Sequence, residues 1–205
     1  MFSTLRKLSF ADTFTLANLF FGFFAIFTGS VNYLFISAIM DGADGMVARS
    51  TGSGEFGKEL DSLADLLSFG FLPSFFLLKS FGFRFLVFVV SFAYVACAAI
   101  RLARFNVTES RNFVGLPVTA SALLLAALLS SGERLAALYL TPFLSLFMVC
   151  DVVYPKIRDG RILFPASIVV FLAFFGITAP LIVLCVIYIV SPLLRGVPGV
   201  YRLWG

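Results

Sequence analysis

The chain has 205 residues, of which 60% are hydrophobic and only 13% are charged, with a mean hydropathy of +1.04 and a net charge of +4. A soluble domain needs polar residues to cover its surface, so this composition excludes an ordinary soluble fold and predicts an integral membrane protein. The positive charge does not indicate nucleic-acid binding, because the cations lie at the ends of apolar segments, where membrane insertion places them.

The apolar segments, taken in chain order, predict an all-α membrane protein with about eight transmembrane helices. A bilayer core about 30 Å thick is crossed by roughly 17–25 apolar residues. Short breaks with turn-forming residues separate the segments, and no soluble domain is inserted, so residues 1–205 are expected to form a single transmembrane domain. The predicted spans are 13–29, 31–49, 58–79, 83–105, 117–131, 135–151, 162–176 and 178–195.

The basic residues predict the orientation of these helices. With eight spans, both termini lie on the same side as the loops after the second, fourth and sixth spans, and this side holds twelve of the fifteen Lys and Arg residues. Cytoplasmic loops are enriched in Lys and Arg, so both termini and the loop 50–57 are expected in the cytoplasm. The twelve residues are Arg6, Lys7, Arg49, Lys58, Arg101, Arg104, Arg111, Lys156, Arg158, Arg161, Arg195 and Arg202.

Four aspartates stand out at the adjoining ends of the second and third spans. Asp41 and Asp44 are spaced i,i+3, and Asp61 and Asp65 are spaced i,i+4, so each pair shares one face of its helix. The two helices are antiparallel neighbours, because only a short loop joins them. At a rise of 1.5 Å per residue, the two pairs lie at matched depths, roughly 5–12 Å inside the helix ends. We therefore expect four carboxylates to converge near the cytoplasmic face.

Such a cluster requires compensation, because each ionised carboxylate in a membrane span costs a few kcal/mol and the four repel one another. Carboxylates are hard ligands that suit Mg²⁺, Mn²⁺ or Ca²⁺, and the chain has no histidine for a typical zinc site. Two divalent cations would balance the four charges, and metal pairs stabilise the attacking and leaving oxygens in phosphoryl transfer. The alternative is that the aspartates cap helices or pair with Arg49 and Lys58, which would explain one aspartate more easily than four.

Basic residues at the end of the fourth span have two interpretations. Arg101 and Arg104 are spaced i,i+3, and Arg111 follows in the next loop. They either anchor the span on the cytoplasmic side or bind an anion, because guanidinium groups match both phosphate and carboxylate.

The aspartate segment resembles the signature of the CDP-alcohol phosphatidyltransferase family. That signature has two aspartates, a glycine, an Ala-Arg pair, a spacer, a second glycine and two aspartates four residues apart, and residues 41–65 contain each part. Segments 55–65, 68–73, 101–106 and 115–117 are also similar to the phosphatidylserine synthase branch, including its archaeal ether-lipid form.

The resemblance implies roles for individual residues. It implies that Asp65 adjoins a pair of Mg²⁺ or Mn²⁺ ions and serves as the general base. The metal ligands implied are Asp41, Asp44, Asp61 and, adjoining them, Asp65. The CDP pocket implied is formed by Gly45, Ala48, Arg49 and Gly57.

The function expected from the resemblance is transfer of a phosphatidyl or archaetidyl group from a CDP-lipid to L-serine with release of CMP. The enzyme is expected to be a homodimer in the cytoplasmic membrane, with its active site among the cytoplasmic halves of the helices. Arg101, Arg104 and Arg111 are candidates to bind the serine carboxylate or the lipid phosphate. Glycerol phosphate or inositol phosphate is an alternative acceptor, and a divalent-cation transporter is an alternative of another class. Transporters hold their ions near the bilayer midplane, whereas these aspartates lie near one face.

Overall fold

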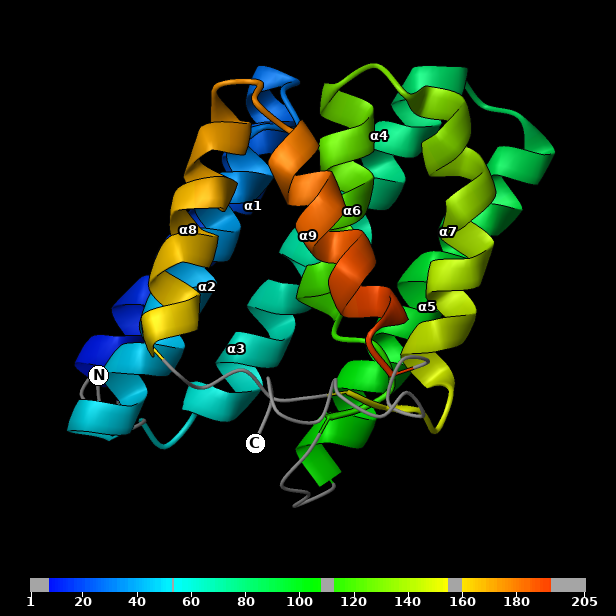
Figure 1. Cartoon of the computed structure of the whole chain (residues 1–205). Coiled ribbons are helices and arrows are strands. Elements are labelled where there is room, and N and C mark those ends of the chain that lie inside the picture. Colours follow the sequence, from blue (N-terminus) through cyan, green and yellow to red (C-terminus); the bar gives the residue numbers. More distant parts are fainter. Residues whose placement is uncertain (1–7, 53, 108–112, 155–159, 193–205) are drawn as a thin grey trace, which may run out of the picture.

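The computed structural model describes residues 8–52, 54–107, 113–154 and 160–192, which form a bundle of helices that alternate in direction along the chain (Figure 1). The predicted all-α class is confirmed. The helices are α1 (Phe10–Thr28), α2 (Tyr33–Thr51), α3 (Gly57–Asp65), the π-helix η2 (Leu66–Phe71), α4 (Leu72–Phe81), α5 (Phe85–Val107), α6 (Val118–Ser130), α7 (Arg134–Val149), α8 (Gly160–Phe174) and α9 (Ala179–Val190).

The described helices correspond to the eight predicted spans. Helices α3, η2 and α4 follow one another without a break and form one rod over residues 57–81, and every other helix overlaps one predicted span. Because the direction alternates, the C-terminal ends of α2 and α5 and the N-terminal ends of α1, α3 and α6 lie at the same end of the bundle (Figure 1). The aspartates of α2 and α3 are at this end, as their spacing predicts.

Three of the described helices are long and apolar enough to cross a membrane: α1, the rod 57–81 and α5. Helix α2 has 19 residues but carries Asp41, Asp44 and Arg49. Helices α6 to α9 have 12 to 16 residues each, which is shorter than a typical span. Transmembrane passage of all eight rods therefore stays a prediction. Seven of the twelve cations that predict the orientation lie outside the described residues: Arg6, Lys7, Arg111, Lys156, Arg158, Arg195 and Arg202.

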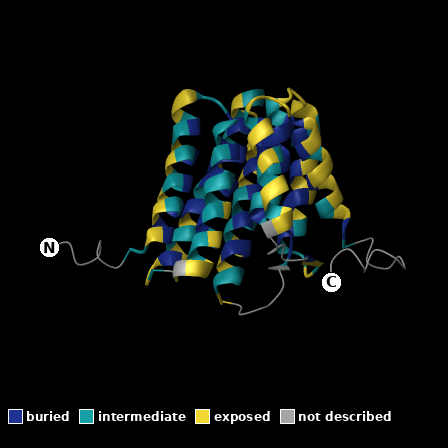
Figure 2. Ribbon diagram, turned by 60° about the vertical axis from the view of Figure 1, so that its left-hand side comes forward, coloured by how far each residue is buried: buried dark blue, intermediate teal, exposed yellow. Residues whose placement is uncertain are grey.

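The outer surface of the bundle is apolar and its interior holds polar groups. On α1, Phe20, Phe23 and Phe27 are 57%, 63% and 80% exposed, whereas Thr15 and Asn18 on the opposite face are buried. Figure 2 shows the same division, with exposed residues along the outer faces of the helices and buried residues between them. Large exposed phenylalanines are expected where lipid rather than water surrounds the protein.

Helix α6 has only 13 residues and packs at the centre of the bundle, where it forms much of the core. It contacts α2, η2, α4, α5, α7 and α9, and its alanines Ala122, Ala126 and Ala127 are fully buried. Small residues allow neighbouring helices to approach closely.

The π-helix η2 directly follows Asp65 and is held by polar side chains of other helices. The Tyr94 hydroxyl donates to the Phe69 carbonyl at 3.2 Å and lies 2.6 Å from the Ser121 hydroxyl oxygen. The Ser68 hydroxyl donates to the Asn18 carbonyl at 3.3 Å. These contacts tie η2 to α1, α5 and α6 and fix the rod at the level of the aspartates.

Two strands of two residues each, β1 (Phe113–Val114) and β2 (Val153–Tyr154), form an antiparallel pair that the sequence did not predict. Two residues are too few to show the alternating pattern of a strand. The turn after β1 is fixed by Gly115, which has a φ of +83° and donates its N–H to the Val152 carbonyl at 2.8 Å. This turn sets where α6 begins.

Candidate active site

The aspartates of α2 and α3 converge as the sequence predicts. Asp41, Asp44 and Asp61 each offer a carboxylate oxygen, and these three oxygens lie within 4.8 Å of one another. Asp44 is only 8% exposed. The i,i+3 spacing on α2 and the antiparallel neighbour α3 together bring the three groups to one point. This separation suits a shared cation.

Asp65 adjoins the three converging carboxylates. It lies one turn further along α3 than Asp61, is 9% exposed, and its carboxyl group is close enough to those of Asp41, Asp61 and Asp44 to interact with them electrostatically. The position agrees with the expectation that Asp65 lies beside the metal ligands at a deeper level.

One cation expected to neutralise these carboxylates has another partner. Lys58, which the alternative interpretation pairs with an aspartate, instead donates its Nζ hydrogen to the Asn106 carbonyl at 2.7 Å. Asp61 Oδ1 is buried and has no hydrogen-bond partner among the described residues. A buried carboxylate oxygen without a partner is costly unless a ligand satisfies it. Hard oxygen donors with an unsatisfied buried oxygen fit a divalent cation such as Mg²⁺ or Mn²⁺.

Three neutral side chains that sequence reasoning missed contact the carboxylates. The Thr15 hydroxyl donates to Asp44 Oδ2 at 2.6 Å, and the Asn18 amide donates to Asp65 Oδ1 at 3.2 Å. Thr119, in the first turn of α6, lies near the Asp41 carboxyl group. The sequence feature that could have identified the two residues of α1 is a row of polar residues at helical spacing within a largely apolar helix: Asp12, Thr15 and Asn18.

The residues implied to bind CDP lie between the carboxylates and the ends of α2 and α3. Arg49 is exposed in the last turn of α2, and Gly57 is buried in the first turn of α3. Gly45 lies one turn before Arg49. A Cβ atom added at Gly45 would lie 3.7 Å from Arg49 NH1, so the space beside this guanidinium group is unfilled by a side chain at position 45. Ala48 is half-buried on the same turn as Arg49. The four residues thus lie on α2 and α3 between the aspartates and the adjoining ends of these helices.

Arg101 is buried near the cluster. It is 5% exposed, its Nε donates to the Leu116 carbonyl at 3.1 Å, and its guanidinium carbon lies 5.6 Å from the centre of the Phe105 ring. It is within electrostatic range of the Asp65 carboxylate. A buried cation at this place can bind an anionic group next to Asp65.

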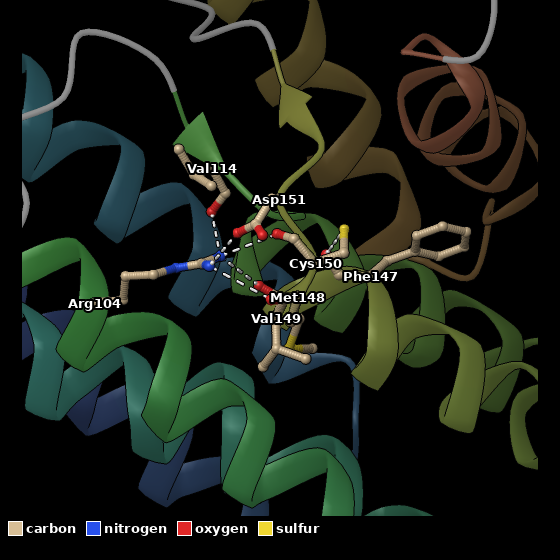
Figure 3. Close-up of polar contacts among 7 residues, drawn as sticks. All are labelled: Arg104, Val114, Phe147, Met148, Val149, Cys150 and Asp151. Atoms are coloured by element: carbon tan, nitrogen blue, oxygen red, sulfur yellow. Dashed lines mark hydrogen bonds and ion pairs between the residues drawn. The ribbon is translucent and has the colours of Figure 1, made fainter.

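Arg104 has several partners within the protein (Figure 3), and its expected role as a ligand of the acceptor or of a lipid phosphate stays a prediction. Its NH1 group contacts Asp151 Oδ1 at 3.1 Å and the Val149 carbonyl at 3.4 Å. Its NH2 group donates to the carbonyl oxygens of Val114, Met148 and Cys150 at 2.9–3.4 Å. These contacts use the four terminal hydrogens of the guanidinium group. The remaining candidate, Arg111, lies outside the described residues.

Comparison with known proteins identifies relatives along most of the chain. The sequence pattern of the CDP-alcohol phosphatidyltransferase family matches residues 8–157. A Methanocaldococcus jannaschii protein named CDP-diacylglycerol–serine O-phosphatidyltransferase is 33% identical over 201 residues, which cover 97% of this chain and 100% of the relative. A Methanothermobacter thermautotrophicus archaetidylserine synthase is 33% identical over 64% of this chain and 61% of its own length. A Helicobacter pylori CDP-diacylglycerol–serine O-phosphatidyltransferase is 34% identical over 74% of each chain.

Proposed function

Since the chain belongs to the CDP-alcohol phosphatidyltransferase family, we propose that it transfers a phosphatidyl or archaetidyl group from a CDP-lipid to L-serine and releases CMP. The observation that carries this proposal is the convergence of Asp41, Asp44 and Asp61, at signature positions, to within 4.8 Å. The relatives named as serine phosphatidyltransferases, one of them similar along its whole length, support serine as the acceptor.

The metal ligands in this proposal are Asp41, Asp44 and Asp61, with Asp65 adjoining them, and they would hold two Mg²⁺ or Mn²⁺ ions. Such ions, when bound, polarise phosphoryl oxygens and stabilise the charge that develops on the attacking and leaving oxygens. The buried oxygen of Asp61 that lacks a partner supports this assignment. Thr15 gives Asp44 a neutral hydrogen bond that leaves the negative charge of the carboxylate available to cations.

Asp65 is the proposed general base. The serine hydroxyl oxygen forms a bond to the lipid-side phosphorus, while the bond from that phosphorus to the bridging oxygen breaks and CMP leaves with this oxygen. The hydroxyl proton passes to the Asp65 carboxylate, whose deeper position on α3 suits a phosphorus at the lipid side of the nucleotide. Because Asp65 borders the metal ligands, it contributes mainly by holding the hydroxyl in a reactive position.

Substrate binding is assigned to residues around the carboxylates. Gly45, Ala48, Arg49 and Gly57 are proposed to form the CDP pocket, because bare backbone and a cation at helix ends favour a pyrophosphate. Arg101 is proposed to bind the serine carboxylate or the lipid phosphate. It is buried and within electrostatic range of Asp65.

The placement in the membrane is also part of the proposal. We place the protein in the cytoplasmic membrane as a homodimer with eight spanning rods, and with both termini and the active site toward the cytoplasm. The distribution of Lys and Arg along the sequence supports this orientation. The ends of α2, α3 and α5 that meet at the carboxylate end of the bundle (Figure 1) carry Arg49, Lys58, Arg101 and Arg104.

The test is CMP release by the purified protein in detergent with Mn²⁺ or Mg²⁺. CDP-diacylglycerol and CDP-archaeol are each offered with serine, glycerol phosphate or inositol phosphate, and the lipid product is identified by mass spectrometry. We expect CMP release that requires serine, and loss of the signal with a chelator and in Asp61→Asn. Asp151→Asn is the matched control, because Asp151 is an exposed aspartate away from the cluster. Turnover with glycerol phosphate or inositol phosphate and none with serine would contradict the assignment.

A further inference from the structure

We infer that Thr15 and Asn18 of α1 are positioning residues that divide the site between them: Thr15 orients Asp44 for metal binding, and Asn18 orients Asp65 for transfer. The inference rests on the proposed function and assigns a role to a helix that lies outside the aspartate signature. The two residues are spaced i,i+3 and share the buried face of α1.

Asn18 is held on both sides of its amide. Its Nδ2 donates to Asp65 Oδ1 at 3.2 Å, and its Oδ1 accepts a hydrogen bond from the Ser37 hydroxyl of α2. Asn18 and Ser37 are both fully buried. An ionised carboxylate accepts hydrogen bonds and donates none, so the amide nitrogen must face Asp65 and the amide oxygen must face Ser37. Asp65 thus determines the orientation of the amide, and Ser37, whose hydroxyl also donates to the Asn18 backbone carbonyl at 3.0 Å, holds the amide oxygen in place.

Thr15 makes the corresponding contact to the other helix. Its hydroxyl donates to Asp44 Oδ2 at 2.6 Å, and the residue is 3% exposed. This contact holds one oxygen of Asp44 toward α1. Asp44 belongs to the three carboxylates that converge to within 4.8 Å, whereas Asp65 stands beside them.

The neutral character of both donors matters for the chemistry. A lysine or arginine in their place would neutralise the carboxylate and compete with a divalent cation. A hydroxyl or an amide fixes the direction of the carboxylate and leaves its charge in place. Groups that orient metal ligands in this way contribute about 10- to 100-fold to metal affinity or activity.

The division of roles predicts that the two substitutions have different effects. Thr15→Val keeps the shape of the side chain and removes the donor to Asp44, so we expect Mn²⁺ affinity to fall by about 10- to 100-fold. Asn18→Leu removes the donor to Asp65, so we expect kcat to fall by about 10- to 100-fold. In Asn18→Leu, the Mn²⁺ affinity and the KM for CDP-lipid should stay as in the wild type.

The experiment measures Mn²⁺ binding by calorimetry, CDP binding in the presence of Mn²⁺, CMP release and thermal unfolding. The matched control is Asn32→Leu, because Asn32 is also an interhelical amide. Its Nδ2 donates to the Phe174 carbonyl at 3.1 Å and its Oδ1 accepts from Ser130 at 2.7 Å. It lies at the end of α2 opposite the aspartates. We expect this control to lower the unfolding temperature and to leave kcat and Mn²⁺ affinity unchanged.

Further outcomes decide the inference. Ser37→Ala is a milder variant, because it leaves Asn18 in the chain and removes only the hydroxyl that contacts its amide oxygen. It should lower kcat, and by less than Asn18→Leu does. This variant still tests the role of Asn18 if Asn18→Leu fails to fold. Equal loss of kcat in Asn18→Leu and Asn32→Leu, or unchanged Mn²⁺ affinity in Thr15→Val, would overturn the inference. A wild-type protein that binds Mn²⁺ but releases no CMP would refute the proposed function instead. The Mn²⁺ titration of Thr15→Val needs no turnover and would still decide the role of Thr15.

Discussion

Replacing Arg104 by alanine should destabilise the fold without changing how the enzyme uses serine. The Arg104 guanidinium lies against the C-terminal end of α7 and contacts Asp151 and the carbonyl oxygens of Val114 and three residues at this helix end (Figure 3). The last carbonyls of a helix have no partner within it, so a cation at this place satisfies them and interacts favourably with the helix dipole.

The expected size of the effect follows from these contacts. A hydrogen bond from a charged donor contributes about 1.5–3 kcal/mol. The Arg104 side chain is 30% exposed and two of its contacts are as long as 3.4 Å, so water can replace part of what is lost. We therefore expect the free energy of unfolding to fall by about 2–4 kcal/mol in total. In a chain of this size that lowers the unfolding temperature by roughly 4–16 °C.

The assay is thermal unfolding in detergent, followed by the serine dependence of CMP release below the transition. Asp151→Asn removes only the ion pair to an aspartate whose side chain is 93% exposed, so it should cost less than about 1 kcal/mol. Arg84→Ala is the matched control, because Arg84 is exposed at the opposite end of the bundle. Unchanged stability of Arg104→Ala together with a strongly raised KM for serine would refute this reasoning. It would indicate instead that Arg104 binds the acceptor.

Three further predictions concern the active site. Replacing Asp41, Asp44 or Asp61 by Asn should abolish CMP release and weaken Mn²⁺ binding measured by calorimetry, and a variant with near-normal turnover would contradict the metal assignment. Asp65→Asn should still bind CDP-lipid and lose transfer, whereas loss of nucleotide binding as well would make Asp65 chiefly a metal ligand. Arg101→Ala should raise the KM for serine by roughly 10- to 150-fold, the equivalent of a charge-assisted contact of 1.5–3 kcal/mol. A raised KM for CDP-lipid with normal serine dependence would show instead that Arg101 binds the lipid phosphate.

The convergence of the aspartates could be predicted from the sequence because it depends on local geometry. The spacing of Asp41 and Asp44 on one helix, and of Asp61 and Asp65 on the next, determines which face each pair occupies. The short loop between the helices then determines that the two faces meet. The helical rods could be predicted for a similar reason, because long apolar runs are read directly from the chain. Both features involve neighbours in sequence.

The contacts that the sequence did not reveal join residues far apart in the chain. Asn18 meets Asp65 across 47 residues, and Arg104 meets Asp151 across 47 residues. Arg104 illustrates the difficulty, because its position at the end of an apolar span fits a membrane anchor, an anion ligand or a helix cap equally well. Only the packing of α5 against α7 distinguishes among these roles. The polar residues of α1 gave a weaker signal, because threonine and asparagine also occur in spans as plain helix-packing residues.

The turn between α5 and α6 connects the two halves of the proposed site. Arg101 donates to the Leu116 carbonyl at 3.1 Å, and the Leu116 N–H donates to the Phe147 carbonyl at 2.8 Å. Three residues after Leu116, Thr119 lies near the Asp41 carboxyl group. The segment whose Leu116 carbonyl accepts from Arg101, the proposed acceptor-binding arginine, therefore also positions Thr119 beside Asp41, a proposed metal ligand. A shift of this turn would disturb both, so the contacts of Arg104 to the same turn and to α7 support the geometry of the active site without touching a substrate.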